Sequence, residues 1–305
     1  MKDLKFLFIG LANAGKTSIL RTLDNNFEMI PTLTPTAGVE YKTFKVMGFT
    51  VSAWDLGGQQ KYRKKYLQEN ERYFQETAAV FYVVDTQAKE EFKEALAYLE
   101  SVRGAFKDLK QENIPFTFML HKYDPHVRGK VEGIENDVAG LKASIDKILG
   151  NIPHTFFETS IYETHSVYQA FSETILTYVP NRDIIGSKLR EIAQDFDSKM
   201  SILLDSAGYI YGQWHSKDAQ LLELSKFIRI AQEFAKLTSK QTYAEFTLLT
   251  LDDISDVAAS LFLVGDELFL VSMLVPHAWF MQDVKMQDMF TKKAREFAKI
   301  LKIFQ

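Results

Sequence analysis

The sequence predicts an α/β domain with a mostly parallel six-stranded sheet and helices on both faces, followed by an α+β domain. Over the first 180 residues, apolar β-rich runs alternate with helical patterns, which is typical of a parallel sheet covered on both sides. Beyond residue 184 the order becomes helix, two strands, helix, three strands, helix, which predicts an antiparallel five-stranded sheet. A length of 305 residues suits two domains. We expect them at 1–180 and 184–305.

Each element rests on a local pattern. In the first domain the strands are expected at 4–9, 41–47, 51–54, 79–85, 116–120 and 155–158, and the helices at 16–24, 59–77, 90–107, 133–149 and 166–178. Pro180 then breaks the pattern, because proline disfavours helix at the residue before it. In the second domain the helices are expected at 184–196, 218–237 and 283–304, and the strands at 201–205, 209–214, 244–251, 257–264 and 268–274, with a tight turn at Gly265-Asp266.

Composition excludes several classes of protein. A net charge of −4 gives no global electrostatic reason to expect a nucleic-acid partner. The absence of cysteine excludes disulfides, thiol catalysis, thiolate zinc sites, prenylation and palmitoylation, and it fits a reducing compartment. Lys2 excludes N-myristoylation, and the charges around the first apolar run argue against a signal peptide. Any membrane association would therefore be indirect, through a partner or an amphipathic surface.

The stretch GLANAGKTS follows the first predicted strand and opens a helix. Its spacing fits the phosphate-loop pattern G-x-x-x-x-G-K-[ST], in which glycines let backbone N–H groups approach phosphate oxygens. A chance glycine turn before a helix is the alternative. We expect Lys16 to reach the β- and γ-phosphates and Thr17 to ligate Mg²⁺. The expected nucleotide contacts in this loop are Gly10, Ala12, Asn13, Ala14, Gly15, Lys16, Thr17 and Ser18.

A second element, WDLGGQ, ends the third predicted strand. Asp55 ends this strand, where its carboxylate could help to hold the magnesium ion; the alternative is that it only caps the next helix. Gly58 can bring its N–H to a γ-phosphate, and Gln59 can orient an attacking water. The candidate catalytic residues are thus Gln59, Lys16 and Gly58.

A threonine on a mobile loop can bind Mg²⁺ only when a γ-phosphate is present. In Pro35-Thr36-Ala37-Gly38 we favour Thr36 for this role, with Thr32 and Thr34 as competitors. The expected metal ligands are therefore Thr17, Thr36 and Asp55.

Two further loops follow the fifth and sixth predicted strands. In His121-Lys122-Tyr123-Asp124 a carboxylate can accept two hydrogen bonds from guanine, a pair of donors that adenine does not offer, and the stem of Lys122 can cover the base. A solvated charged loop is the alternative. The backbone of Ser160 and Ile161 could contact the edge of the base.

With these five elements in order, the chain resembles the Ras-like small GTPases. The phosphate loop and WDLGGQ look like the Arf branch, whereas His121, where Ras and Arf proteins carry asparagine, is similar to the Rag/Gtr branch. Rag proteins continue into a roadblock domain, whose element order resembles that after residue 184. In most GTPases the asparagine ties the base loop to the phosphate loop, so guanine selectivity would rest mainly on Asp124.

The resemblance implies a P-loop GTPase domain followed by a roadblock-like domain, with GTP or GDP as ligand and Mg²⁺ as cofactor. It further implies slow GTP hydrolysis without an activating protein and homo- or heterodimerisation through the C-terminal domain. Activating and exchange proteins and a roadblock scaffold are the expected partners. The expected location is cytoplasmic, with recruitment to an endomembrane by those partners. The rival hypotheses are an Arf-like trafficking GTPase with an appended longin-type domain, which would open with strands, and a nucleotide-binding scaffold that does not cycle.

Overall fold

The structure is a computed structural model that describes residues 2–131, 133–179, 182–217, 219, 221–238, 246–250, 255–264, 267–276 and 284–302. The chain divides into two compact units, Met1–Ala170 and Phe171–Gln305. The predicted break at Pro180 and the predicted turn at Gly265-Asp266 lie outside the described residues.

The first unit is built on a six-stranded sheet in the order β2-β3-β1-β4-β5-β6, counted over the described residues. All neighbouring pairs are parallel except the hairpin of β2 and β3. This confirms the predicted fold class. The strands are β1 (Lys2–Gly10), β2 (Val39–Val46), β3 (Phe49–Leu56), β4 (Thr77–Asp85), β5 (Phe116–His121) and β6 (His154–Thr159).

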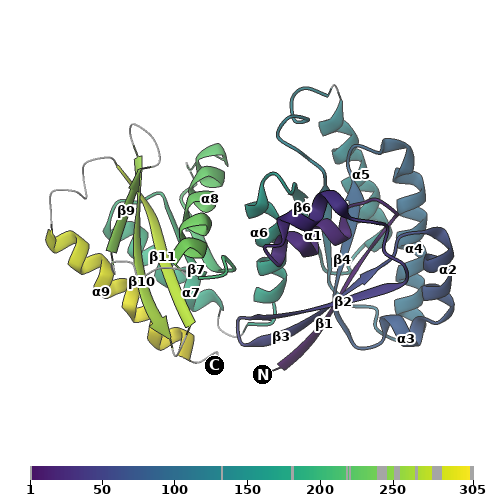
Figure 1. Ribbon diagram of the computed structural model, residues 1–305, viewed down its shortest axis with the longest axis horizontal. Helices are drawn as coiled ribbons and strands as arrows, with labels where there is room; N and C mark the ends of the chain where they lie inside the picture. Colours follow the sequence, from purple (N-terminus) through teal and green to yellow (C-terminus); the bar gives the residue numbers. More distant parts are fainter. Residues whose placement is uncertain are drawn as a thin grey trace. The chain divides into compact units, whose positions relative to one another are not determined.

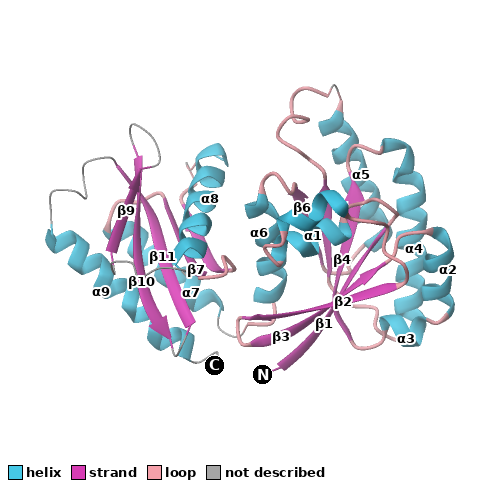
Figure 2. Cartoon of the chain, viewed as in Figure 1, coloured by secondary structure: helices cyan, strands magenta, loops and turns pink. Residues whose placement is uncertain are grey.

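Helices cover both faces of this sheet, with α1 on one side and α2–α5 on the other (Figures 1 and 2). Strand β4 is therefore buried along nearly its whole length. Its side chains alternate between the faces: Tyr82 packs in the cluster under α4 and α5, while the ring of Phe81 stacks on Phe8 with centroids 4.5 Å apart. The helices are α1 (Lys16–Leu23), α2 (Gln60–Gln68), α3 (Asn70–Phe74), α4 (Phe92–Asp108), α5 (Ile134–Leu149) and α6 (Thr164–Leu176), with short 3₁₀ turns η1 (Phe27–Thr32) and η2 (Lys89–Glu91).

One predicted helix is wrong in extent. The sequence favours a single helix over 59–77, but the structure has two, because the backbone at Glu69 leaves the helical region at φ −105° and ψ 44°. The interruption lets Tyr73 and Phe74 of the short α3 turn into the core. The turn η1 was not predicted.

The parallel strands place five loops at one edge of the sheet. Strands β1, β3, β4, β5 and β6 run in the same direction, so their carboxyl ends meet there. Four of the five motifs singled out in the sequence lie at or follow one of these ends, and the loop that carries Thr36 precedes β2, whose antiparallel pairing of Val39 with Leu56 places its start at the same edge. The topology alone therefore gathers the candidate site.

The second unit is an antiparallel sheet in the order β8-β7-β11-β10-β9, counted over the described residues. Helix α8 packs on one face, and α7 and α9 lie on the other (Figure 1). The unit has the predicted order and begins with a helix, unlike a longin-type domain. Its elements are α7 (Arg182–Asp195), β7 (Met200–Asp205), β8 (Ile210–His215), α8 (Leu221–Thr238), β9 (Phe246–Thr250), β10 (Ser255–Val264), β11 (Glu267–Pro276) and α9 (Val284–Leu301).

Helices α7 and α9 are joined by charge as well as by apolar packing. Lys293 pairs with Glu191 and Asp195 of α7, and the ring of Phe290 meets that of Phe196 edge-on at 5.6 Å. Among the described residues, no helix combines the length and apolar character needed to cross a bilayer.

Candidate nucleotide-binding site

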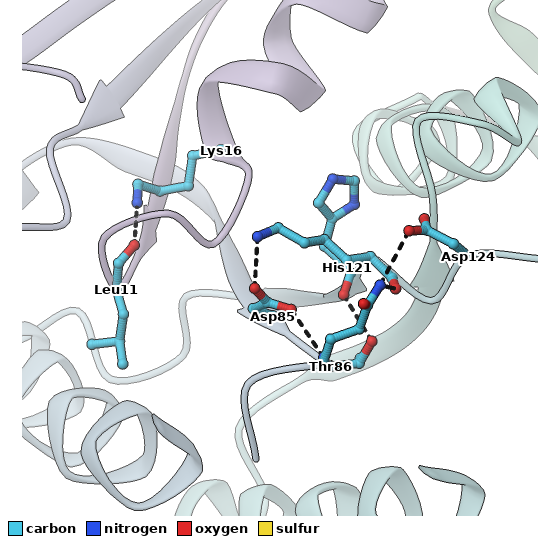
Figure 3. Close-up of polar contacts among 8 residues, drawn as sticks. Leu11, Lys16, Asp85, Thr86, His121 and Asp124 are labelled. Atoms are coloured by element: carbon cyan, nitrogen blue, oxygen red, sulfur yellow. Dashed lines mark hydrogen bonds and ion pairs between the residues drawn. The ribbon is translucent and has the colours of Figure 1, made fainter. Parts of the chain in front are cut away.

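The phosphate loop buries the amine of Lys16. Helix α1 begins directly after Gly15, whose φ of +97° favours glycine. The Nζ of Lys16 donates hydrogen bonds to the carbonyl oxygens of Leu11 at 2.7 Å and Gly10 at 3.3 Å (Figure 3). Burial lowers the pKa of Lys16 to about 8, and the nearby carboxylate of Asp55 partly opposes this. In the described part of the chain, no ion pair includes Lys16.

A buried ammonium without an anionic partner is unfavourable, because carbonyl groups compensate only part of its lost hydration. An anion bound at the phosphate loop would stabilise this buried ammonium. The backbone N–H groups at the N-terminus of α1 attract the same anion.

Three oxygen-bearing side chains meet beside Lys16. The hydroxyl of Thr17 lies 2.5 Å from Oδ2 of Asp55 and 2.9 Å from the hydroxyl of Thr36. Thr36 Oγ1 is in turn 3.4 Å from the same carboxylate oxygen. Thr32 instead donates to the carbonyl of Met29 within its own turn. Of the competing threonines, Thr36 is thus the one beside Thr17 and Asp55.

This cluster fits a magnesium ion. Its donors are all oxygen, and Oδ1 of Asp55 is buried without a hydrogen-bond partner among the described residues. Burial raises the pKa of Asp55, and a cation bound beside the carboxylate would oppose this effect. Among the residues that the structure describes, no group of three or more His, Asp or Glu side chains gathers for a metal. A site with few protein ligands suits Mg²⁺, which retains waters and phosphate oxygens.

The loop after β3 lies against the phosphate loop. A Cβ on Gly58 would come within 2.2 Å of the carbonyl oxygen of Leu11, so only glycine fits this approach. Arg63 of α2 donates from Nε to the carbonyl of Gly58 at 2.9 Å. Its guanidinium also pairs with Glu94 and lies over the ring of Tyr98.

The same helix also holds the loop that carries Thr36. The hydroxyl of Tyr66 donates to the carbonyl oxygen of Gly38 at 2.7 Å, and the N–H of Gly57 donates to that oxygen at 2.9 Å. Two side chains of α2, Arg63 and Tyr66, therefore link the two loops that would face a γ-phosphate.

These loops enclose a pocket of about 290 Å³ at the edge of the sheet. Leu33, Thr34 and Pro35 line it in addition to the predicted residues. Its full lining is Ala12, Asn13, Gly15, Lys16, Thr17, Ser18, Leu33, Thr34, Pro35, Thr36, Gly58 and Gln59. The other predicted site residues are outside this lining, in the last residues of β1, β3 and β5 or in the loops that follow β1, β5 and β6, namely Gly10, Ala14, Asp55, His121, Lys122, Asp124, Ser160 and Ile161.

The loops after β4, β5 and β6 hold Asp124 firmly. Oδ1 of Asp124 accepts from the hydroxyl of Ser160 at 2.5 Å, and Oδ2 accepts from the side-chain amide of Gln87 at 3.1 Å. Lys122 donates from Nζ to Oδ2 of Asp85 at 2.6 Å. Asp124 is thus a buried carboxylate of fixed orientation.

His121 packs directly on the phosphate loop. Its ring is buried, and a Cβ on Gly15 would come within 2.3 Å of its Cδ2. Nδ1 lies 3.0 Å from the hydroxyl of Thr159. Burial lowers the pKa of His121 to about 4, so the ring is neutral at pH 7. The histidine therefore still joins the base loop to the phosphate loop, through packing on Gly15.

Sequence reasoning missed Asp85, Gln87, Arg63 and Tyr66. Asp85 ends β4 at the same edge of the sheet as the motifs, so the rule that ligands bind at strand ends was a usable signal. No such signal marks Arg63 and Tyr66, because both bind backbone carbonyls of other loops.

The parallel sheet, the phosphate loop and the loops around it define a P-loop protein of the small GTPase class. The model of the conserved region of Gtr1/RagA G proteins matches residues 5–234. The chain belongs to this family: it is a Rag/Gtr-type GTP-binding protein, and the members of the family are GTPases.

Three individual proteins are similar to this chain. The GTP-binding protein gtr1 of Schizosaccharomyces pombe is 22% identical over 260 residues, covering 81% of this chain and 80% of that protein. ADP-ribosylation factor-like protein 3 of Chlamydomonas reinhardtii is 33% identical over 122 residues, covering 40% of this chain and 64% of that protein. The Arl6 BBS3 small GTPase of Trypanosoma brucei, solved with the nucleotide analogue GppNp, is 22% identical with a TM-score of 0.46, covering 58% of this chain and 97% of that one.

Replacing Tyr66 with phenylalanine tests the link between α2 and the Thr36 loop. Loss of one hydrogen bond to Gly38 should speed deuterium exchange at the amides of residues 36–39 by about fivefold. Tyr73→Phe is the matched control, since Tyr73 is equally buried and its hydroxyl makes no hydrogen bond within the described residues. Equal exchange in the two variants would contradict the link.

The depressed pKa of His121 predicts a specific pH dependence of stability. The unfolded chain binds a proton near the ordinary pKa of 6.5, but folded His121 does so only near pH 4. Stability therefore falls as the pH drops through this window. Between pH 7 and pH 5 the wild type should lose about 2 kcal/mol more than His121→Asn. Urea denaturation at both pH values measures this difference, and parallel pH profiles of the two proteins would refute it.

Proposed function

We propose that the pocket binds the phosphates of GTP or GDP together with Mg²⁺ and reports which nucleotide is present. The observation that carries this proposal is the ammonium of Lys16, which is buried and takes part in no ion pair within the residues that the structure describes. A nucleotide's phosphates would supply an anionic partner for this ammonium.

Each neighbouring residue then has a role. Thr17 and Thr36 would hold Mg²⁺ through their hydroxyls, with Asp55 accepting hydrogen bonds behind them. When bound, the ion neutralises charge on the β- and γ-phosphate oxygens. Lys16 would stabilise the same oxygens, the N–H of Gly58 would face the γ-phosphate, and Gln59 would orient the attacking water.

The switch lies in the two loops around the pocket. Thr36 and Gly58 would both contact the γ-phosphate side, and α2 ties both loops through Tyr66 and Arg63. Hydrolysis would remove the group that both loops contact and change the surface that partners bind.

We expect hydrolysis to be slow without help. Arg63, the arginine nearest Gln59 in sequence, is engaged by Glu94, Tyr98 and the carbonyl of Gly58. A partner that adds a positive charge would accelerate the reaction by about 10³–10⁵-fold.

The second unit would serve as a dimerisation platform. Strand β9 lies at one end of the sheet within the described residues. An edge strand offers unpaired N–H and C=O groups, which a strand of a second roadblock-type domain can join. A homo- or heterodimer formed in this way would recruit activating, exchange and scaffold proteins, and through them an endomembrane from the cytoplasm.

Gln59→Leu tests hydrolysis against a scaffold that only binds nucleotide. Loss of the water-orienting amide should slow single-turnover GTP hydrolysis by on the order of tenfold or more, with GDP affinity unchanged. Gln60→Leu changes the adjacent, exposed glutamine and should leave the rate intact. An unchanged rate in Gln59→Leu would contradict the role of Gln59, and absence of turnover in the wild type would favour the scaffold.

Sedimentation velocity tests the platform. The protein purified from its own cells should sediment at micromolar concentration as a complex of two chains of this size. A species with the mass of one chain would refute dimerisation.

A further inference from the structure

The carboxylate of Asp124 is held from two sides by side chains of other loops. Ser160 donates to Oδ1 and Gln87 donates to Oδ2, at 2.5 Å and 3.1 Å. Ser160 belongs to a loop already expected at the base. Gln87 follows β4, is exposed, and belongs to no motif.

Gln87 is itself fixed at both ends. Its backbone N–H donates to Oδ1 of Asp85 at 2.9 Å. Its side-chain amide donates to the carbonyl oxygen of Lys122 at 2.7 Å as well as to Asp124. Both partners are acceptors, so only the NH₂ group of the amide can satisfy them. Gln87 thus bridges the first and last residues of the Lys122–Asp124 segment.

The bonds from Ser160 and Gln87 determine which acceptor sites of Asp124 stay open to a ligand. An ionised carboxylate offers about four acceptor sites, two on each oxygen. Ser160 and Gln87 occupy one site on each oxygen of Asp124, which leaves one on each for a ligand. Guanine presents two adjacent donors, its ring N–H and its exocyclic amine.

We infer that Gln87 is a positioning residue for nucleotide specificity: it orients the Asp124 carboxylate so that both oxygens accept from one guanine base. This inference rests on the proposed binding of guanine nucleotides. Without the Gln87 bond, one oxygen loses its orienting partner and the carboxylate can turn about its bond. A ligand that needs both oxygens then loses more than one that needs a single oxygen.

Inosine diphosphate makes this difference measurable, because hypoxanthine keeps the ring N–H but lacks the exocyclic amine. Calorimetry on the full chain with Mg²⁺ would give the affinities for GDP and IDP. In Gln87→Met, which keeps the length of the side chain and removes its donors, we expect the GDP-to-IDP affinity ratio to fall at least about threefold. Gln87→Glu, which places a second carboxylate beside Asp124, should lower the ratio further.

Gln60→Met, on the exposed face of α2, is the control and should keep the wild-type ratio. An equal loss for GDP and IDP in Gln87→Met, or no loss, would overturn the inference, because Gln87 would then only support the loop. Wild-type protein that binds neither nucleotide would instead refute the proposed function. Since Gln87 is exposed, both substitutions should leave the fold intact, which thermal unfolding checks.

Discussion

The site depends on one buried positive charge, the ammonium of Lys16. The chain gives this group carbonyl oxygens and a nearby carboxylate but no ion pair within the described residues. The surrounding loops are organised around the anion that would complete it. The N–H groups at the N-terminus of α1 would attract the same anion, and the Thr17 hydroxyl and the Asp55 carboxylate lie next to each other as oxygen donors for a cation.

The two sensing loops are coupled to each other before any ligand contact is considered. Arg63 and Tyr66 lie about one turn apart on α2, and each binds a backbone carbonyl of a different loop. A movement of α2 would therefore affect Gly58 and the Thr36 loop together. In the proposed switch, this arrangement would connect the state of one phosphate group to the position of α2.

The order of elements and the phosphate loop were predictable, because alternating apolar runs and glycine spacing are local signals. The choice of Thr36 over Thr32 was argued from the sequence, and only the fold brings Thr36 to Thr17. The break at Glu69 was not predictable, because the helical pattern of the sequence continues across this residue. The break accompanies the burial of Tyr73, which depends on the tertiary structure. The roles of Gln87, Arg63 and Tyr66 were not predictable for another reason. All three bind backbone carbonyl oxygens, which carry no sequence signature, and the partners of Gln87 and Tyr66 are also distant in sequence.

The central claim is that the loop around Lys16 binds the phosphates of a guanine nucleotide. Isothermal calorimetry on nucleotide-stripped protein in the presence of Mg²⁺ tests it most directly. The account predicts saturable binding of GDP and GTP, and loss of binding to both when Lys16 is replaced by alanine. Absence of heat for both nucleotides in the wild type, with the protein shown to be folded, would contradict it.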